Sequence, residues 1–385
     1  MYLIYTAFDK SKSKPKILGS IIRDKDTNET YIWPMYIKGN SEKAYDTKQK
    51  EKFIRDIITS QQASINDFKS HITALQLPLE ADYKISEIPI GDEIISREWS
   101  VLEGFMQQKL ETMEQQANNS KWQNLIAEAT LVYSALEKRG VIYDGNLEPM
   151  HPIYDVGTFT GRSRTSEFNI QGMGDDAPIS PIRTDYNIML CADWIAADMR
   201  MASLMSGDTI MQQSFITADP YVYLTEQMGI DRPDCKKQML SSIYSLNTNS
   251  EVLNYFPEFR KWIDASKIKM HKDGYLSSVL GRPFKCDGDN DRAVFNATIQ
   301  GSMAHAMQNS LIKLHKKYPQ SILTELHDSI ILCCNKNMLK SMIDDVATCM
   351  LHPFNGLLDH NPTFPVRILV GNKWRAWKEY QVYRI

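Results

Sequence analysis

The chain has 385 residues, 43% of them hydrophobic, and a formal net charge of −3 at pH 7. This length and composition predict a globular protein with two or three domains, and they exclude a disordered or fibrous chain. The near-neutral balance excludes a chain that is basic over its whole surface, but it leaves open a local basic cleft for nucleic acid.

The cysteines and the apolar runs limit where in the cell the protein is expected. No two cysteines form a C-x-x-C pair, and Cys333 and Cys334 are adjacent, which suits neither a zinc site nor a disulfide framework. The N-terminal MYLIYTAFDK lacks the pattern of a secretory signal, and no run approaches the roughly 20 apolar residues of a membrane-spanning helix. We therefore expect a cytoplasmic location, meaning the host cytoplasm or nucleoid if a phage encodes the chain.

The N-terminal third begins as a small α/β unit and becomes helical. Residues 2–8 and 16–24 are strand-like, and residues 50–62 carry helical spacing. Apolar residues at three and four spacing predict further helices at 95–116 and 121–140, the second of which ends at a glycine.

The remainder alternates strands and helices after an irregular segment, residues 146–185, that is rich in Gly, Pro, Ser and Asp. The predicted elements in chain order are a strand at 187–193, helices at 196–207, 231–246, 257–274 and 296–318, a hairpin over 325–334, a helix near 336–351 and a last strand at 365–371.

Two aspartates stand at strand ends. Asp193 ends an apolar strand, and Asp328 lies at the tip of a hairpin whose His327-Asp328 pair lacks the residues that hairpin turns favour. Two nearby carboxylates repel unless a proton or cation lies between them, and a two-magnesium centre, with ions about 3.5–4 Å apart, would supply one. The alternative is that Asp328 is only a turn residue.

A predicted helix after Asp231 presents cations on one face. Arg232, Lys236, Leu240 and Tyr244 recur every fourth residue, beside an N-terminus whose free N–H groups favour phosphate. This pattern predicts a triphosphate site that ends in an aromatic ring for a base. The alternative is a solvated basic face whose leucine and tyrosine point to the core.

Seven motifs occur in order over about residues 130–380. They are TGRSRTSEFNIQ at 160–171, ADWIAADMRMASLMSGD at 192–208, RPDCKKQMLSSIYS at 232–245, GYLSSVLGRPF at 274–284, RAVFNATIQGSMAHA at 292–306, LHDSIIL at 326–332 and VGNKW at 370–374. Together they resemble family A DNA polymerases, in which the second, third and sixth motifs are called motifs A, B and C.

The resemblance implies a mixed α+β right-hand polymerase, with an antiparallel palm sheet, helical fingers and a minimal thumb. The domains it implies are residues 1–110 as a degenerate 3′–5′ exonuclease-like α/β domain, 111–150 as a helical connector or vestigial thumb, and 151–385 as palm and fingers.

The resemblance also implies the roles of individual residues. Two Mg²⁺ ions, which Mn²⁺ can replace, would be held by Asp193, Asp328 and the backbone of Trp194. Lys236 and His327 would join the aspartates in catalysis. The incoming nucleotide would contact Arg232, Lys236, Leu240, Tyr244 and Asp198, and DNA would contact Arg162, Arg200, Arg292, Asn296, Gln300 and His327.

The chain departs from the family pattern at several positions. Asp198 stands where motif A carries Glu against the sugar 2′ position, Leu240 where motif B carries Phe or Tyr, and Ser329 where motif C carries Glu. Asp198 could instead pair with Arg200 or another neighbour. The thumb before residue 160 is deleted or very short and the fingers are shortened, so we expect a weak, salt-sensitive hold on duplex and low processivity without a partner protein.

The N-terminal region lacks the acids of a proofreading exonuclease. Residues 64–77 resemble the asparagine-led exonuclease helix, but His71 stands where an aspartate is expected. Residues 4–10 lack an Asp-x-Glu, and Arg97 or Trp99 falls near the position of the last carboxylate. We therefore expect no proofreading; the alternative is an unrelated α/β cap on the palm.

The predicted function is template-directed DNA synthesis on primed DNA with dNTPs, in a phage, plasmid or organelle-type system. One alternative is a single-subunit RNA polymerase or primase-like enzyme, which shares the Arg-x-x-x-Lys helix and a His-Asp-Ser at motif C. The other is a non-catalytic, polymerase-like DNA-binding replication factor.

Overall fold

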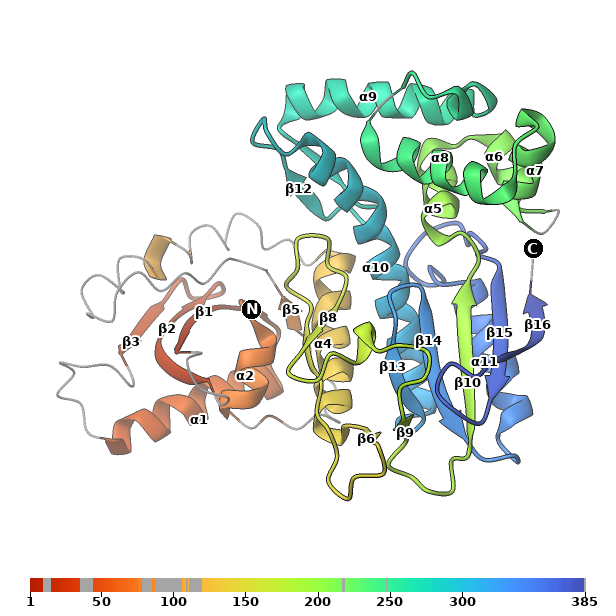
Figure 1. Ribbon diagram of the computed structural model, residues 1–385. Coiled ribbons are helices and arrows are strands. Elements are labelled where there is room, and N and C mark those ends of the chain that lie inside the picture. Colours follow the sequence, from red (N-terminus) through yellow and green to blue (C-terminus); the bar gives the residue numbers. More distant parts are fainter. Residues whose placement is uncertain are drawn as a thin grey trace. The chain divides into compact units, whose positions relative to one another are not determined.

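The structure is a computed structural model that describes residues 1–9, 15–34, 44–75, 77, 85–87, 106–108, 110, 120–216, 219–246 and 248–383. It divides into two compact units, Met1–Ala135 and Leu136–Ile385, each of which is described by itself (Figure 1). None of the helices in these described ranges combines the length and the apolar character needed to cross a membrane.

The first unit is built on a five-stranded sheet with the order β3-β2-β1-β4-β5. β1 is antiparallel to β2 and parallel to β4. The strands are β1 (Tyr2–Asp9), β2 (Lys16–Asp24), β3 (Thr30–Pro34), β4 (Ala63–Ile65) and β5 (Ile85–Glu87), and the helices are α1 (Ala44–Ser60), α2 (Phe68–Leu75) and most of α4 (Lys121–Arg139).

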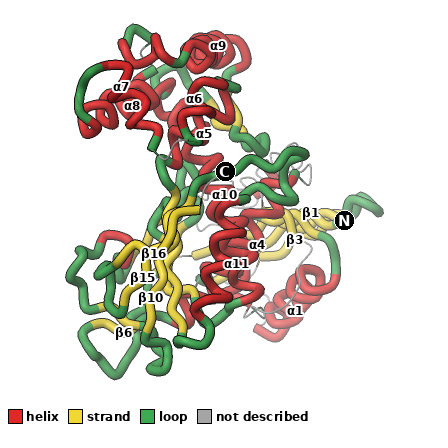
Figure 2. Tube along the Cα trace, turned by 90° about the vertical axis from the view of Figure 1, so that its right-hand side faces the viewer, coloured by secondary structure: helices red, strands yellow, loops and turns green. Residues whose placement is uncertain are grey.

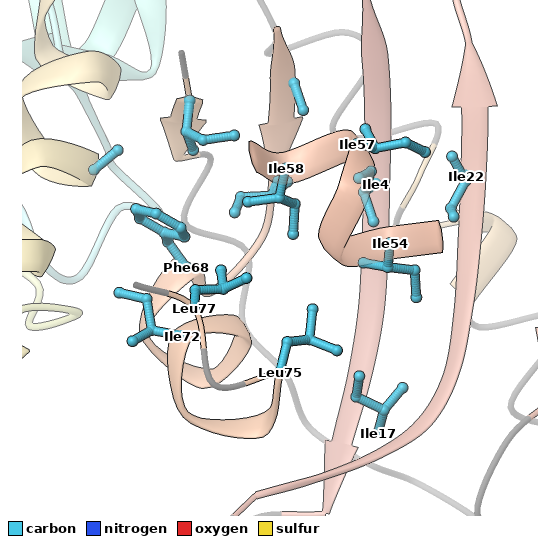
Figure 3. Packing of buried hydrophobic residues seen from close by; sticks show 14 of the residues in the cluster. Ile4, Ile17, Ile22, Ile54, Ile57, Ile58, Phe68, Ile72, Leu75 and Leu77 are labelled. Atoms are coloured by element: carbon cyan, nitrogen blue, oxygen red, sulfur yellow. The ribbon is translucent and has the colours of Figure 1, made fainter. Parts of the chain in front are cut away.

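An isoleucine-rich core joins the sheet to the helices of the first unit. Ile4 and Ile22 come from the sheet, Ile54 and Ile58 from α1, and Phe68 from α2, and Figure 3 shows these side chains gathered between the elements. All five are completely buried. The predicted small α/β unit is therefore confirmed.

The second unit is centred on a sheet with the order β13-β14-β10-β15-β16, in which all neighbouring strands are antiparallel. α11 packs against β10 and β15, and Figure 2 shows α10 and α11 along one face of this sheet. The strands are β10 (Ile188–Trp194), β13 (Ile322–Glu325), β14 (Ser329–Cys334), β15 (Val366–Gly371) and β16 (Lys378–Tyr383), and the two helices are α10 (Asp291–Lys317) and α11 (Leu339–Leu351).

Five helices lie beyond the end of β10, where the chain leaves the sheet (Figure 1). Asp208, Asp219 and Asp231 cap three of them by accepting hydrogen bonds from backbone N–H groups in the first turn. The helices are α5 (Ala197–Ser206), α6 (Thr209–Ser214), α7 (Pro220–Met228), α8 (Arg232–Ser245) and α9 (Pro257–Asp273).

Short elements complete the second unit. Three two-stranded sheets pair β6 (Ile142–Tyr143) with β9 (Ile179–Ser180), β7 (Ile153–Asp155) with β8 (Arg164–Ser166), and β11 (Tyr275–Ser277) with β12 (Pro283–Lys285); the 3₁₀ helices are η1 (Ile170–Gly172) and η2 (Glu251–Tyr255).

The mixed α+β fold class predicted from the sequence is confirmed, and the differences lie in element ends and in elements that were not predicted, among them α6 and α7. The helix predicted at 296–318 begins at Asp291, and the edge strand β16 was not predicted. Most of the helix predicted at 95–116 lies outside the described residues, as do Arg97 and Trp99. The division between the units falls inside α4, and the predicted domain limits at 110 and 150 stay predictions.

Candidate active site

The two predicted metal-binding aspartates lie on neighbouring strands at one end of the second unit's sheet. In the antiparallel register of β10 and β14, Asp193 lies opposite Ser329. The backbone N–H of Trp194 donates to the carbonyl oxygen of Asp328 at 3.0 Å. Residues that are far apart in the sequence are thus brought side by side by strand pairing.

The turn that carries Asp328 has an unusual backbone. The N–H of Leu326 donates to the carbonyl of Ser329 at 2.8 Å, and the N–H of Asp328 donates to the carbonyl of Leu326 at 2.7 Å. This tight turn holds the intervening His327 at a φ of 60°, in the left-handed region that a side chain of this size rarely adopts. Strained backbone of this kind concentrates at functional sites.

A buried glutamate stabilises this turn. Glu325, which is 1% exposed, accepts a hydrogen bond from the backbone N–H of His327 at 2.6 Å. Ser163 donates to its other oxygen, and Gln171 donates to the same oxygen at 2.9 Å. Burial raises the pKa of Glu325 to about 7, against these hydrogen bonds. The Thr-Gly-Arg segment and the motif C turn are therefore joined through one carboxyl group.

The ionised forms of the two aspartates are destabilised in spite of the cations near them. Burial, followed by the charge of Asp198, raises the pKa of Asp328 to about 6, whereas Arg162 opposes this shift. Burial also raises the pKa of Asp193, although Arg367 beside it acts in the opposite direction. Since desolvation and like charge both penalise the ionised forms, added positive charge at this point would be stabilising.

The donor set fits a hard divalent cation. Asp193 and Asp328 offer carboxylate oxygens, which Mg²⁺ prefers, and Mg²⁺ keeps several of its positions for water and substrate phosphate. In the described part of the chain, no group of three or more His, Cys, Asp or Glu side chains could hold an ion by itself. Two carboxylates fill only part of the six positions around Mg²⁺, so this pair fits an open site that water and substrate complete.

Motif A, motif B and the Thr-Gly-Arg segment meet at Asp198. Arg162 donates from Nη2 to the Oδ1 of Asp198 at 2.9 Å and lies 3.5 Å from the Oδ1 of Asp328. The hydroxyl of Tyr244 donates to the other oxygen of Asp198. Burial and the charge of Asp198 raise the pKa of Tyr244, so this hydroxyl keeps its proton. Asp198 thus pairs with a neighbour, as the alternative interpretation proposed, but this neighbour is Arg162 and not Arg200.

The cationic face of α8 forms as the sequence predicted. Asp231 caps the helix by accepting from the N–H of Asp234 at 2.9 Å. Lys236 is exposed, and its positive charge interacts with both Asp193 and Asp328, because it acts to lower the pKa of each carboxyl group.

The remaining residues of this face differ in exposure. Arg232 is half exposed, and it pairs with Asp219 and lies over the ring of Tyr221 at 5.4 Å. Leu240 and Tyr244 are half-buried. The face is therefore mixed, with its cations open to solvent and its apolar end partly covered.

The predicted DNA contacts divide into two groups. Arg292, Asn296 and Gln300 share one face of α10; Arg292 is exposed and the other two are half-buried. The Oδ1 of Asn296 has no hydrogen-bond partner among the described residues, which leaves an acceptor for a ligand. Arg162 and His327 adjoin Asp328, as described above.

Arg200 does not belong with these residues. It is 9% exposed, its Nε donates to the carbonyl of Thr363 at 2.8 Å, and its guanidinium lies 4.9 Å from the ring centre of Phe215. A guanidinium used in this way packs the protein interior and is not presented to DNA, so the prediction of a DNA contact at Arg200 is not supported.

Three charged residues near the site were missed in the sequence. From the sequence alone, Glu325 is only the end of a predicted strand and Asp219 is only a possible helix cap. Arg367 is only a charged residue within the last predicted strand. Arg367 lies opposite Asp193 on β15 and bonds to it, an arrangement that depends on the strand order. The sequence held no signal for that order.

A known protein family, several curated proteins and a solved structure resemble this chain, and all of them are DNA polymerases. Residues 222–376 match the model for DNA polymerase family A. DNA polymerase theta of Caenorhabditis elegans is 23% identical over 268 residues, which are 60% of this chain and 16% of that protein. DNA polymerase I of Mycobacterium tuberculosis is 26% identical over 228 residues, which are 45% of this chain and 24% of that protein. The chain thus spans less than a quarter of the length of these relatives.

A solved structure shares the fold. The POL domain of Pol1 from M. smegmatis, determined in complex with DNA primer-template and dNTP, superimposes with a TM-score of 0.65 at 14% identity, and the alignment covers 97% of this chain and 96% of that one. The matching family model and the polymerase relatives confirm the resemblance of this chain to DNA polymerase family A, and the shared fold agrees with it.

Proposed function

We propose that the chain is a template-directed DNA polymerase that extends a primer 3′-hydroxyl with deoxynucleoside triphosphates. The observation that carries the proposal is the meeting of Asp193, Asp328 and Lys236 at one end of the sheet, with Arg162 beside them. A module that only binds DNA would not need two desolvated carboxylates beside an exposed ammonium group.

In the proposed reaction, the primer 3′-oxygen attacks the α-phosphorus of the nucleotide, and the bond to the β-phosphate breaks. Two Mg²⁺ ions, held by Asp193, Asp328 and the backbone of Trp194, would lower the pKa of the hydroxyl and neutralise the triphosphate. Lys236 and Arg232 hold the phosphates at the N-terminal part of α8, and Lys236 gives a proton to the leaving pyrophosphate.

The remaining site residues position the DNA. Tyr244 closes the nucleotide site, with Leu240 beside it, and His327 lies beside the primer end. Arg162, Arg292, Asn296 and Gln300 contact the minor groove, where acceptors are nearly the same for every base pair and contacts test shape without reading sequence. In this assignment residues 151–385 supply palm and fingers, residues 111–150 connect them, and residues 1–110 are the degenerate exonuclease-like domain.

The experiment that tests this proposal compares dNTP with rNTP on one primed template. We expect extension with dNTPs and much weaker extension with rNTPs, because Arg162 and Tyr244 hold Asp198 at the proposed sugar pocket. A preference for rNTPs, or synthesis that starts without a primer, would favour the RNA polymerase or primase-like alternative. No extension with either would leave only the DNA-binding alternative.

Asp198 is expected to set this discrimination through its length. Shortening it to Ala should lower the ratio of dNTP to rNTP kcat/KM by roughly 10-fold or more, since a methylene-sized change in a pocket alters discrimination by about 10–200-fold. Lengthening it to Glu should raise the ratio. Equal ratios in Asp198→Ala, Asp198→Glu and the unsubstituted chain would show that Asp198 lies away from the sugar.

The first unit is proposed to lack proofreading activity. Where a nuclease needs acids, Thr6 exchanges backbone hydrogen bonds with the Asn66 amide at 2.8 Å, and its hydroxyl bonds to His71 at 2.9 Å and to Ser20 at 2.9 Å. All four residues are completely buried. This buried network contains no carboxylate, the ligand that a magnesium-dependent nuclease needs, which supports the proposal.

The measurement for this proposal is release of a labelled 3′-terminal nucleotide from a mismatched primer in Mg²⁺ without dNTPs. We expect no release above the level of a sample without enzyme, both in the unsubstituted chain and in Asp193→Asn, whose first unit is unchanged. Release that Asp193→Asn also shows, and that grows with enzyme concentration, would place nuclease activity in the first unit.

The chain is also proposed to hold duplex weakly. Residues 140–159, which lie between α4 and the Thr-Gly-Arg segment and are all described, contain no helix, so this segment has no helical hairpin to grip DNA. We expect only a few nucleotides to be added per binding event in the presence of a DNA trap, and fewer as salt rises, since phosphate contacts are lost with salt. Long products in the trap assay would contradict this and remove the need for a partner protein.

A further inference from the structure

Arg367 hydrogen-bonds to Asp193 from the neighbouring strand on the side opposite to Asp328. β15 and β14 flank β10, and in the register of β10 and β15 Arg367 lies directly opposite Asp193. Nη2 of Arg367 is 2.7 Å from Oδ2 of Asp193. The arginine side chain is 44% exposed and the aspartate side chain 28% exposed, so both groups can reach solvent and ligands.

Arg367 is held loosely for a residue at such a position. Asp193 is the one residue to which it hydrogen-bonds within the described ranges, and its Nε, which is buried, has no partner there. Arginine commonly grips a carboxylate with two parallel bonds, and here it uses one. A single bond between partly exposed groups is exchanged at little cost.

A guanidinium and a divalent cation compete for the same carboxylate. Both need the lone pairs of Asp193, and two positive charges at one carboxylate repel each other. The guanidinium and the cation can therefore both bind tightly near Asp193 only when further negative charge is present. The triphosphate of a nucleotide would supply that charge. Arg367 would then have phosphate oxygens as an alternative acceptor, including for its unpaired Nε.

We propose that Arg367 is a positioning residue that holds Asp193 in place of a divalent cation and weakens cation binding until a nucleotide triphosphate is present. The inference rests on the proposed function, because it takes Asp193 as a metal ligand. If Arg367 weakens cation binding in the free protein and releases Asp193 when a nucleotide binds, the same free energy appears as stronger coupling between cation binding and nucleotide binding. The chain would then load its cations together with the nucleotide.

The test measures Mn²⁺ binding to the full chain by calorimetry and by the loss of the free-ion electron paramagnetic resonance signal, without DNA or nucleotide. Arg367→Gln should bind Mn²⁺ about 3–10-fold more tightly than the unsubstituted chain, an effect of about 1 kcal/mol. Addition of dATP should then tighten Mn²⁺ binding less in Arg367→Gln than in the unsubstituted chain. Arg367→Lys, which keeps the charge, should bind Mn²⁺ as the unsubstituted chain does.

Arg375→Gln is the matched control. Arg375 lies between β15 and β16, pairs with Asp175 at 2.8 Å, and can lose the same charge without touching Asp193. If Arg375→Gln tightens Mn²⁺ binding as much as Arg367→Gln, the effect is one of net charge and the inference is wrong. Mn²⁺ binding in Arg367→Gln that is unchanged or weaker also overturns it.

Asp193→Asn separates this inference from the proposed function. Mn²⁺ binding that is weakened in Asp193→Asn, but not tightened in Arg367→Gln, overturns the role of Arg367 and leaves the metal assignment intact. Mn²⁺ binding that is unchanged in Asp193→Asn removes the metal assignment, and the inference fails with it. Thermal unfolding of each variant identifies any that is misfolded, and Arg367→Ala, which removes the same charge, then replaces Arg367→Gln in these comparisons.

Discussion

Replacing Asp193 or Asp328 with asparagine is expected to lower the rate of primer extension by about 10³-fold or more. Each change removes a charged ligand from a centre that would stabilise transition-state charge by several kcal/mol, and about 1.4 kcal/mol corresponds to tenfold in rate. The measurement is single-turnover extension by one dNTP at saturating Mg²⁺. Asparagine has the same shape as aspartate, so the loss reports charge and not packing.

The stability of these variants separates catalysis from folding. The pKa of Asp328 is raised above its ordinary value, so its ionised form destabilises the fold as pH rises through about 6, and Asn removes that cost. Asp328→Asn should therefore unfold at an equal or higher temperature at pH 7 without metal. Asp185→Asn, an exposed pair partner of Arg183 just before β10, is the matched control and should extend primers normally. Activity retained in either site variant would refute the metal assignment.

Replacing Lys236 with alanine is expected to lower kcat/KM for dNTP by roughly 10–150-fold. A hydrogen bond to a charged group is worth about 1.5–3 kcal/mol, and Lys236 is proposed to make such bonds to the triphosphate. The KM for dNTP should rise, and kcat should fall as well if Lys236 gives the proton to pyrophosphate. Steady-state extension over a range of dNTP concentrations checks both.

Lys237 provides the control for this prediction. It is the next residue of α8, is equally exposed, and points about 100° away around the helix. Lys237→Ala should leave kcat/KM within about twofold. If both variants lose the same activity, the effect is one of general charge, and Lys236 has no specific place in the nucleotide site.

Local patterns in the sequence were enough to locate the main elements of this site. The strand that ends at Asp193, the hairpin that presents Asp328 and the four-residue spacing along α8 each follow from a short stretch of chain, and the structure has all of them. The cap at Asp231 was equally local. Features of this kind depend on periodicity and turn chemistry, which a single sequence contains.

The contacts that could not be predicted from the sequence depend on the order of the strands and on which face of a helix is buried. Arg367 meets Asp193 only because β15 neighbours β10, and Glu325 meets Ser163 only because the Thr-Gly-Arg segment crosses the motif C turn. Arg200 was assigned to DNA through the family resemblance, yet its side chain packs inward on Phe215. The edge strand β16 is largely exposed, so it lacks the apolar alternation that reveals a strand.

The central claim is that Asp193 and Asp328 share divalent cations at the point of nucleotide transfer. Anomalous diffraction from crystals of the chain with primer-template DNA, a non-hydrolysable dNTP and Mn²⁺ tests this directly. The account predicts anomalous density within coordination distance, roughly 2–2.5 Å, of an oxygen of each aspartate and of the triphosphate. Density bound to the triphosphate alone, with Asp193 still paired to Arg367, would contradict it.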